Sequence, residues 1–356
     1  MSYKTKKRYW PFLFVTDVIG GIVCFWLRFK KFQEPKRIVL LRLEHVGDVL
    51  LTTPAFRAIR KRFPKAKIDV LVRDFSAGIL KNNKNIDNVI VWNAPWLSNL
   101  GEKDSWPSAL RFISKLRKNK YDLAFDFHGD PHNILLAAKI ARYRVGFGAR
   151  GLGFLLNKVV PYGTGHVIDR NLSLAKALGA DVTNKQMDLP FTAQDASHAE
   201  SVVGKLGTSA IVCIAPGSAR EEKNWLNDRW AAVADYLVEE YNAKILFTGG
   251  KKENTMVDDI LGKMKHANDT LNICGQTSLT QLAAILKRCS LIVCPDSGTM
   301  HIARAMNTPL IGLFTVENAR EWGYDEGNFR HIKKFGKEAI TVEDVLNKIK
   351  SMRCLP

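Results

Sequence analysis

From Arg37 onward, short apolar runs alternate with segments of helical periodicity, and this alternation constrains the fold more than any other feature of the chain. Each run is too short for a buried helix and is bounded by polar residues, which is typical of a buried strand. Strands that alternate with helices in this way form β-α-β units around a parallel sheet. The series ends near Leu178 and restarts at Ala210. We therefore expect an α/β protein with two doubly wound, Rossmann-like domains.

The expected boundaries follow from where the pattern stops. Residues 181–190 are polar, lack strong periodicity and end in proline, so we place the linker there. This gives an N-terminal segment 1–36, a first domain 37–190, a second domain 191–340 and a closing helix within 341–356. The first domain should contain strands at 37–43, 67–72, 88–92, 121–125 and 143–147, with helices at 49–63, 105–118, 132–142 and 169–178. The second domain should contain strands at 210–215, 243–247, 270–273, 290–294 and 309–314, with helices at 227–240, 256–264, 278–288 and 300–306.

Basic residues flank an apolar stretch that runs from Tyr9 to Leu27. Asp17 lies near its middle, and a helix that spans a bilayer would bury this carboxylate at a cost of roughly 2.5–3.5 kcal/mol. No small-residue cleavage site follows, so we do not expect a secretory signal. We favour a hydrophobic helix that lies in the plane of an anionic membrane surface. A spanning helix and a helix packed on the protein's own surface are the alternatives.

The chain is strongly basic, with 53 Lys and Arg against 35 Asp and Glu and a formal net charge of +18. Such an excess indicates an anionic partner, which is a nucleic acid, a phospholipid surface or an acidic substrate. The nucleic-acid alternative lacks an RNP signature, zinc spacing or a helix-turn-helix unit in one basic face. The six cysteines form no C-x-x-C pair and several lie in apolar runs, which indicates reduced thiols and a cytoplasmic location.

Ligands of doubly wound sheets bind at the carboxyl ends of the strands, and polar side chains follow several of the predicted strands. After the first strand, Gly47 allows a sharp turn and Asp48 follows at the start of a helix. Asp48 could cap that helix or remove a proton from a bound hydroxyl. In the second domain, Ser218 and Lys223 follow the first strand in a turn suited to phosphate. A turn with a solvated lysine is the simpler alternative there.

Two further strand ends of the second domain carry candidate residues. Asp296 ends one strand, and the amides of residues 297–299 open the next helix as a second anion site. His301, in the first turns of that helix, could contact a ligand or be a satisfied structural histidine. Glu253, after the strand 243–247, could place a carboxylate near a ribose.

In their order along the chain, these stretches resemble the motifs of glycosyltransferase family nine, the bacterial lipopolysaccharide heptosyltransferases. The motifs are R-x-x-x-[hydrophobic]-G-D with T-x-P, then P-G-[ST]…K-x-W, then D-S-G-x-x-H-x-A, and His166-x-x-Asp169-Arg170-Asn171 precedes the linker. The resemblance extends from about Arg37 to about Tyr324. It implies a GT-B fold, an ADP-sugar donor held mainly by the second domain and an acceptor on the first.

The resemblance also implies roles for individual residues. Asp48 would be the general base, and Lys223 and Ser218 would hold the donor diphosphate. Glu253 would bind the ribose, Thr277 would lie in the adenine pocket and Asp296 would bind the sugar hydroxyls. Ser297, Gly298 and Thr299 would bind the diphosphate through their backbone amides. Arg220 and His301 are the other residues expected to bind the donor. On the acceptor side we expect Gly47, Glu44, Arg57, Arg60 and His128.

Two departures from the family pattern lie on the acceptor side. Glu44 stands where many members have serine or another small residue, and His128 replaces the glutamine of the more usual D-x-Q-G. Both leave glycosyl transfer intact but leave the identity of the acceptor open. Glu44 could also compete with Asp48 as the base. We expect the basic residues Arg57 and Arg60 of the early helix to meet an acidic glycolipid.

The expected function is an inverting, metal-independent transfer of heptose from ADP-heptose to a lipopolysaccharide core or a related acidic glycolipid. No D-x-D sequence lies at a strand end, and a lysine with helix-start amides can stabilise a leaving diphosphate. We expect no cofactor, no nucleic-acid partner and peripheral association with the cytoplasmic face of the inner membrane. The alternatives are another nucleotide sugar or acceptor, a nucleotide-sugar epimerase on a related fold, and a non-catalytic membrane-bound scaffold.

Overall fold

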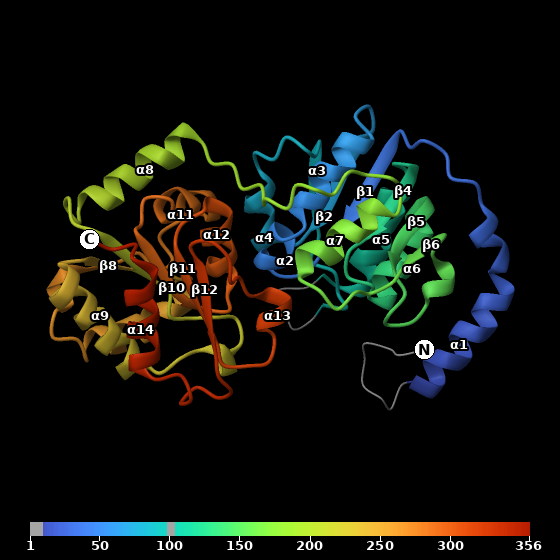
Figure 1. The fold of residues 1–356 in the computed structure, drawn as a ribbon. Coiled ribbons are helices and arrows are strands. Elements are labelled where there is room, and N and C mark those ends of the chain that lie inside the picture. Colours follow the sequence, from blue (N-terminus) through green and yellow to red (C-terminus); the bar gives the residue numbers. More distant parts are fainter. Residues whose placement is uncertain (1–9, 98–103) are drawn as a thin grey trace. The chain divides into compact units, whose positions relative to one another are not determined.

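The computed structural model describes residues 10–97 and 104–356 of the chain. The chain divides into two compact units, Met1–Met187 and Asp188–Pro356. Each unit is built on a six-stranded parallel sheet with helices on both faces (Figure 1). The predicted pair of doubly wound α/β domains is therefore confirmed. The division falls between residues 187 and 188, close to the predicted boundary between 190 and 191.

The strands of the first unit are β1 Arg37–Leu41, β2 Lys67–Val72, β3 Asn88–Val91, β4 Tyr121–Asp126, β5 Ala141–Phe147 and β6 Lys158–Val160. Their order in the sheet is β3-β2-β1-β4-β5-β6, and neighbouring strands are parallel. β1 lies near the centre, where a strand covered on both faces needs a continuous apolar run. Its residues Ile38, Val39, Leu40 and Leu41 are fully buried. β6 lies outside the predicted strands because three residues carry too little pattern.

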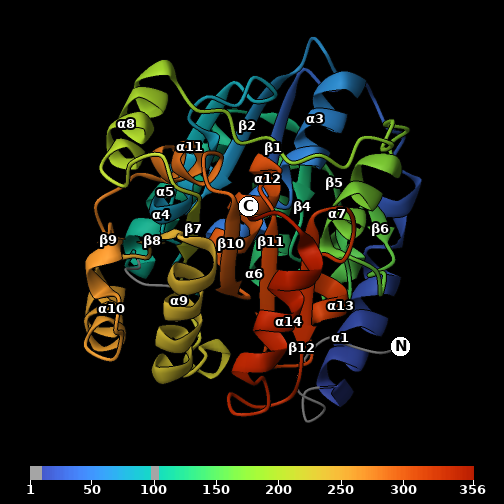
Figure 2. The same cartoon turned by 60° about the vertical axis from the view of Figure 1, so that its left-hand side comes forward.

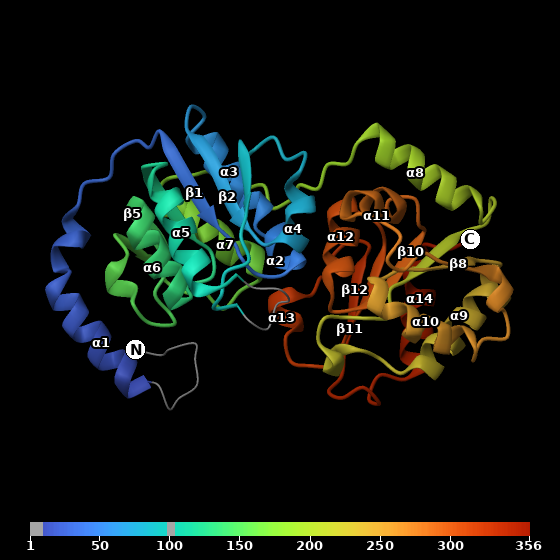
Figure 3. The same ribbon diagram turned by 180° about the vertical axis from the view of Figure 1, so that it is seen from behind.

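The helices of the first unit are α2 Val46–Leu50, α3 Thr53–Arg62, α4 Asp74–Ala77, α5 Trp106–Arg117, α6 Pro131–Ile140 and α7 Val167–Lys176, with the 3₁₀ turns η3 Gly78–Leu80 and η4 Gly153–Leu155. α3 packs on α7, and α5 packs on α6 (Figure 3). The predicted helix at 49–63 is wrong in one respect, because α2 and α3 are separate helices. Pro54 has no amide hydrogen to donate to the carbonyl of Leu50, which accepts instead from the hydroxyl of Thr53 at 2.8 Å.

The strands of the second unit are β7 Ile211–Ile214, β8 Lys244–Phe247, β9 Thr270–Asn272, β10 Leu291–Pro295, β11 Leu310–Phe314 and β12 Phe329–Lys333. Their order is β12-β11-β10-β7-β8-β9. The register places Ile214 beside Val293 and Pro295 beside Leu313, so β7, β10 and β11 end close together. β12 lies outside the predicted strands, since an edge strand with mixed exposure has a weak apolar pattern.

The helices of the second unit are α8 Ala193–Gly204, α9 Asn227–Tyr241, α10 Asn254–Leu261, α11 Leu279–Leu286, α12 Gly298–Met306, α13 Ala319–Trp322 and α14 Val342–Met352, with the 3₁₀ turns η5 Glu221–Lys223, η6 Lys251–Glu253 and η7 Ala267–Asp269. α9 packs on α10 and α14, whereas α11 packs on α8 and α12 (Figure 2). The two groups cover the two faces of the sheet. α8, which follows the linker directly, was not among the predicted helices.

A further helix, α1 Trp10–Val23, continues into the 3₁₀ helix η2 Phe25–Phe29 and lies along the first unit (Figures 1 and 3). Asp17, in the middle of α1, accepts a hydrogen bond from the amide of Leu152 at 2.8 Å. The carboxylate that argued against a spanning helix thus ties α1 to a loop of the first unit. Within residues 10–97 and 104–356, no helix is long and apolar enough to cross a membrane. The basic residues that precede Trp10 lie outside the described part of the chain.

Two more contacts hold α1 and η2 on the first unit. Gly20 lies so close to Phe154 that a Cβ atom there would come within 2.4 Å of the ring. The carbonyl of Leu27 accepts a hydrogen bond from the side chain of Asn157 at 2.9 Å. One face of this segment is therefore packed on the protein, which was one of the predicted alternatives.

Candidate active site

Asp48 lies in the first turn of α2, shortly after the carboxyl end of β1. Its Oδ2 accepts a hydrogen bond from the amide of His45 at 3.2 Å and so caps the helix. Its Oδ1 accepts a hydrogen bond from Nη2 of Arg42 at 2.9 Å. The side chain is 15 % exposed, so the carboxylate is held at both oxygens yet still reaches solvent. Capping and proton removal, predicted as alternatives, are compatible at this position.

Arg42 is the cation that fixes this turn. Besides binding Asp48, its guanidinium donates a hydrogen bond to the carbonyl of Phe127 at 2.8 Å. Its Nη1 also lies 3.5 Å from Oε2 of Glu44. One buried arginine thereby joins the loops that follow β1 and β4, which are neighbours in the sheet. The motif R-x-x-x-[hydrophobic]-G-D contains this arginine, although no role was predicted for it.

Glu44 belongs to the same charged cluster and is only 6 % exposed. Its carboxylate lies 2.7 Å from Nδ1 of His128, and Nε2 of His128 lies 2.7 Å from Nη1 of Arg150. Burial alone would raise the pKa of Glu44, but the charges of His128, Arg42 and Arg150 outweigh it and lower the pKa to about 2. A carboxylate with so low a pKa is a weak base. The side chain of Glu44 is also 8 % exposed and faces His128 and Arg42, whereas that of Asp48 is 15 % exposed, so Asp48 is the more accessible proton acceptor.

Asp126 ends β4 and shapes the turn that carries His128. Its side chain accepts hydrogen bonds from the amides of His128 at 3.1 Å and Gly129 at 3.0 Å. Gly129 has a φ of +75°, and a Cβ atom there would lie 2.6 Å from the carbonyl oxygen of Phe147, so the turn requires glycine. Burial raises the pKa of Asp126 to about 7. The position of His128 thus depends on the hydrogen bonds of one buried carboxyl group.

Arg57 and Arg60, the basic residues of α3 predicted to meet the acceptor, both have partners within the protein. Arg57 donates a hydrogen bond to Oδ1 of Asn184 at 3.0 Å, in the segment that links the two units. Arg60 forms an ion pair with Asp87. An acidic acceptor would have to share or replace these contacts. The acceptor role of the two arginines stays a prediction.

In the second unit, Lys223 and Asp296 form a buried ion pair. Nζ of Lys223 lies 2.6 Å from Oδ2 of Asp296, and the two side chains are 14 % and 5 % exposed. Lys223 ends η5, which follows β7, and Asp296 comes directly after the neighbouring strand β10. The alternative of a solvated lysine does not fit this burial. An ammonium group is instead held at the carboxyl edge of the sheet, where a phosphate could reach it.

Ser218 lies on the turn that leads to Lys223. Its hydroxyl accepts a hydrogen bond from the amide of Arg220 at 3.2 Å, and its own amide donates to Oδ1 of Asn224 at 2.8 Å. The side chain of Arg220 is exposed and forms an ion pair with Glu222. The predicted residues Ser218, Arg220 and Lys223 therefore lie in one short turn, and hydrogen bonds within the turn fix its conformation.

Glu253 ends η6 after β8 and lies against the loop that follows β7. A Cβ atom at Gly217 would come within 2.4 Å of Cγ of Glu253, and one at Gly250 would come within 2.9 Å of its Oε2. Glycine at both positions therefore lets the carboxylate approach the two loops. Thr277 lies half-buried between β9 and α11. Both predicted residues follow strands of the sheet that carries Asp296.

α12 begins at the carboxyl end of β10 with Ser297, Gly298 and Thr299. The side chain of Ser297 makes no capping hydrogen bond to the helix. A helix start of this kind presents free backbone amides to an anion. His301 is buried, and its Nδ1 lies 2.8 Å from the hydroxyl of Tyr324. This geometry fits the alternative that His301 is a structural histidine rather than a ligand-binding one.

Within the part of the chain that the structure describes, the cysteines and carboxylates do not group as a metal ion requires. All six cysteines are unpaired, and Cys213, Cys274, Cys289 and Cys294 are buried. Among residues 10–97 and 104–356, no group of three or more His, Cys, Asp and Glu side chains is placed to hold a metal ion.

These residues and their order along the chain match a known family. The sequence model of glycosyltransferase family 9 (heptosyltransferase) matches residues 109–343. The chain belongs to this family. It is therefore a glycosyltransferase, as the resemblance of its motifs predicted.

Individual relatives and solved structures agree with this assignment. The chain is 27 % identical over 295 residues to the lipopolysaccharide core heptosyltransferase OpsX of Haemophilus influenzae, with 80 % of this chain and 81 % of that protein covered. The glycosyl transferase family 9 structure from Veillonella parvula is 25 % identical, with a TM-score of 0.77 over 89 % of this chain and 97 % of that chain. The E. coli heptosyltransferase WaaC with ADP is 19 % identical, with a TM-score of 0.66 over 88 % of this chain and 97 % of that chain. The predicted GT-B fold is confirmed.

The ion pairs of Glu44 should stabilise the fold in a pH-dependent way. A carboxyl group whose pKa falls from 4.5 to about 2 on folding adds stability that is fully present above about pH 4.5 and is lost as the pH falls toward 2. The variant Glu44→Gln lacks this contribution, because a neutral amide cannot pair with His128 or Arg42. The difference in the free energy of unfolding between wild type and variant should be about 3 kcal/mol near neutral pH and should shrink on acidification.

Denaturant unfolding at a series of pH values between about 7 and 3 measures this difference. Glu338→Gln, at an exposed position of the second unit, is the matched control and should stay close to wild type throughout. A difference for Glu44→Gln that does not change with pH would show that the lost charge is not what destabilises the variant.

Proposed function

We propose that this glycosyltransferase moves heptose from ADP-heptose to a lipopolysaccharide core or a related acidic glycolipid, with inversion at the anomeric carbon. The observation that supports this most directly is the buried Lys223–Asp296 ion pair beside the start of α12. A cation and helix-start amides of this kind can bind the phosphates of a nucleotide diphosphate. The name of the relative OpsX, a lipopolysaccharide core heptosyltransferase, and the ADP in the WaaC structure support the substrate class.

Asp48 is the group placed to take the proton of the acceptor hydroxyl. Arg42 and the amide of His45 fix the orientation of its carboxylate. As the hydroxyl gives its proton to Asp48, its oxygen forms a bond to the anomeric carbon, and the bond from this carbon to the diphosphate oxygen breaks. The electron pair of the broken bond leaves with ADP. A single displacement of this kind inverts the anomeric centre.

The leaving diphosphate gains negative charge, and the second unit supplies positive charge for it. Lys223 offers an ammonium group, and Gly298 and Thr299 offer backbone amides at the start of α12. These groups stabilise the diphosphate without a metal ion, and we propose a metal-independent reaction on that basis. Because Asp296 also binds Lys223, the diphosphate has to compete with a carboxylate for the ammonium group.

Two alternatives use the same fold. Another nucleotide sugar or acceptor would leave Asp48 and Lys223 in their roles. Another acceptor would be selected by residues such as Glu44 and His128, which depart from the family pattern. A non-catalytic scaffold would not need a carboxylate fixed by Arg42 or a buried lysine at a strand end. These two features therefore favour a catalytic role over a scaffold.

Replacing Asp48 by asparagine removes the proton acceptor and keeps the size of the side chain. We expect transfer to fall by about a hundredfold to ten-thousandfold, because general-base catalysis contributes that much. ADP binding should survive, because the proposed donor residues belong to the other unit. Mass spectrometry of the glycosylated core acceptor measures transfer, and calorimetry measures ADP binding.

Glu44→Gln is the companion variant for this test and should retain more transfer than Asp48→Asn. Retained turnover in Asp48→Asn, together with its loss in Glu44→Gln, would move the base to Glu44. Loss of ADP binding in Asp48→Asn would instead show that the substitution disturbs more than the proton acceptor.

We also infer that the outward face of α1 and η2 binds the anionic cytoplasmic surface of the inner membrane. Large apolar side chains remain exposed on this segment, although its other face is packed on the first unit. Ile22 is 74 % exposed and Trp26 is 64 % exposed. The other exposed apolar residues of the segment are Phe14, Val15, Val18, Ile19, Val23, Phe25 and Phe29. An apolar patch of this kind marks an interaction surface.

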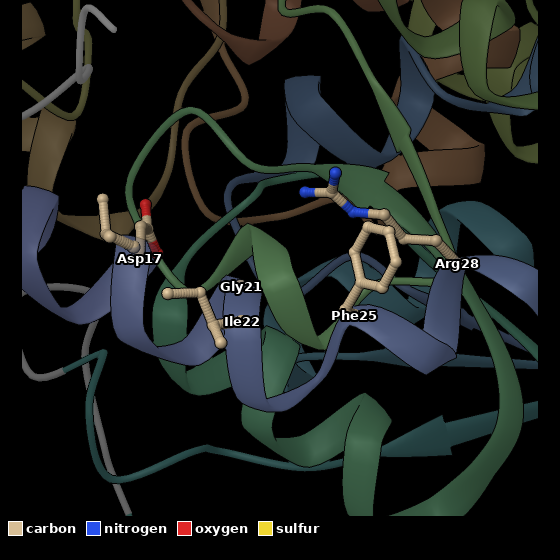
Figure 4. A pocket seen from close by; sticks show the side chains of 6 residues that line it. Asp17, Gly21, Ile22, Phe25 and Arg28 are labelled. Atoms are coloured by element: carbon tan, nitrogen blue, oxygen red, sulfur yellow. The ribbon is translucent and has the colours of Figure 1, made fainter.

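The chemistry around this patch fits a lipid surface better than another apolar protein face. Figure 4 shows a hollow in it, lined by Val18 and by Asp17, Gly21, Ile22, Phe25 and Arg28. Exposed Arg28, Lys30 and Lys31 follow the apolar residues in the chain. Apolar side chains beside cations are typical of helices that lie in the interface of an anionic membrane.

The double substitution Ile22→Glu and Trp26→Glu should weaken membrane binding more than about tenfold, because it puts carboxylates where apolar groups would enter the interface. Co-sedimentation with vesicles of phosphatidylglycerol and phosphatidylcholine measures binding. Wild type should sediment with these vesicles, less so at high salt, and less with phosphatidylcholine alone.

Leu110→Glu is the matched control, because Leu110 is 65 % exposed on α5 of the same unit. It should sediment like wild type. Equal sedimentation of the control and the double variant would contradict the proposed membrane role of α1 and η2. Failure of the wild type to sediment with the vesicles would contradict it as well.

A further inference from the structure

Asn318 lies in the turn between β11 and α13 and contacts the Lys223–Asp296 ion pair. Its Nδ2 donates a hydrogen bond to Oδ2 of Asp296. The same oxygen lies 2.6 Å from Nζ of Lys223. One charged donor and one neutral donor thus share a single carboxylate oxygen. Because the carboxylate is almost completely buried, these donors rather than water compensate its charge.

Hydrogen bonds fix the turn that carries Asn318. Its amide donates to the carbonyl of Val316 at 2.9 Å. The hydroxyl of Thr315 donates to the carbonyl of Glu222 at 2.8 Å, which ties the turn to η5. Because η5 also carries Lys223, the cation, the carboxylate and the amide side chain are held by connected loops.

One buried polar atom beside the ion pair, Oδ1 of Asn318, has no hydrogen-bond partner among the described residues. Buried polar atoms of folded proteins are nearly always paired with protein, water or a ligand. The carbonyl oxygen of the Asn318 side chain can therefore accept a hydrogen bond from a water molecule or a ligand at this site.

We propose that Asn318 is a positioning residue that holds the Asp296 carboxylate while Lys223 passes to the donor diphosphate. This proposal rests on the proposed function, which places a nucleotide diphosphate at Lys223. A buried carboxylate that loses the cation paired with it is strongly destabilised. The amide of Asn318 keeps a hydrogen bond to Asp296 when the ammonium group leaves. It thereby lowers the free-energy cost of releasing Lys223 to the diphosphate.

The proposal predicts a defect in donor binding for Asn318→Ala. Without the amide, Asp296 loses one of the two side-chain donors that the described residues give it, and it retains Lys223 more strongly. The dissociation constant of ADP should rise at least about tenfold, as expected when a hydrogen bond to a charged group is lost. Calorimetric titration with ADP measures this directly and needs no acceptor. Asn318→Asp, which keeps the size but replaces the donor by a carboxylate, should bind ADP at least as weakly.

A double-variant cycle separates positioning from a general structural effect. If Asn318 acts through Asp296, Asn318→Ala should change ADP binding little in an Asp296→Ala background, because no carboxylate is left to hold. Asn328→Ala is the matched control, since Asn328 is exposed in the same unit. It should bind ADP like wild type. Thermal unfolding of each variant checks that it is folded.

The outcomes distinguish this inference from the proposed function. Failure of the wild-type enzyme to bind ADP would overturn the proposed function and with it the role of Asn318. ADP binding by wild type and by Asn318→Ala with equal affinity would overturn the inference alone. An equal loss of affinity in the wild-type and Asp296→Ala backgrounds would also overturn it, because the effect would then not pass through Asp296.

Discussion

Parallel strands bring the loops at their carboxyl ends to one edge of the sheet, and the charged cluster of each unit depends on this constraint. In the first unit it allows Arg42, after β1, to bind the carbonyl of Phe127, 85 residues later in the chain. In the second unit it allows Lys223, after β7, to bind Asp296, 73 residues later and directly after β10. The central position of β1, β4, β7 and β10 in their sheets makes these charged loops neighbours.

The two units use buried cations of different kinds, and the difference suits their proposed roles. Arg42 binds Asp48, Glu44 and the carbonyl of Phe127 at once, as a planar guanidinium with a rigid set of donors can. It therefore acts as a clamp that keeps the base in place. Lys223 is a compact charge on a flexible stem, and a group of this kind can pass from the Asp296 carboxylate to a phosphate.

The sequence pattern predicted those parts of the fold whose residues are close together in the chain. The apolar runs predicted the parallel sheets and the two domains, whereas the short β6, the edge strand β12 and the helix α8 lay outside the prediction. The motifs predicted Asp48, Lys223 and Asp296, but not their partners. Asn318 lies in a turn without motif or periodicity, and its contact with Asp296 depends on β11 lying next to β10. Likewise, the charge of Arg57 was visible in the sequence, but its bond to Asn184, 127 residues later, was not.

The central claim is that the second unit binds ADP through Lys223. A thermal-shift comparison of ADP, UDP and GDP, on wild type and on Lys223→Ala, tests this most directly. A ligand at a hundred times its dissociation constant adds about 2.7 kcal/mol to the stability of the folded protein, so a true donor nucleotide should stand out. We predict that ADP stabilises the wild type more than UDP or GDP does, and that Lys223→Ala loses most of this shift. Equal shifts with all three nucleotides, or an undiminished ADP shift in Lys223→Ala, would contradict the claim.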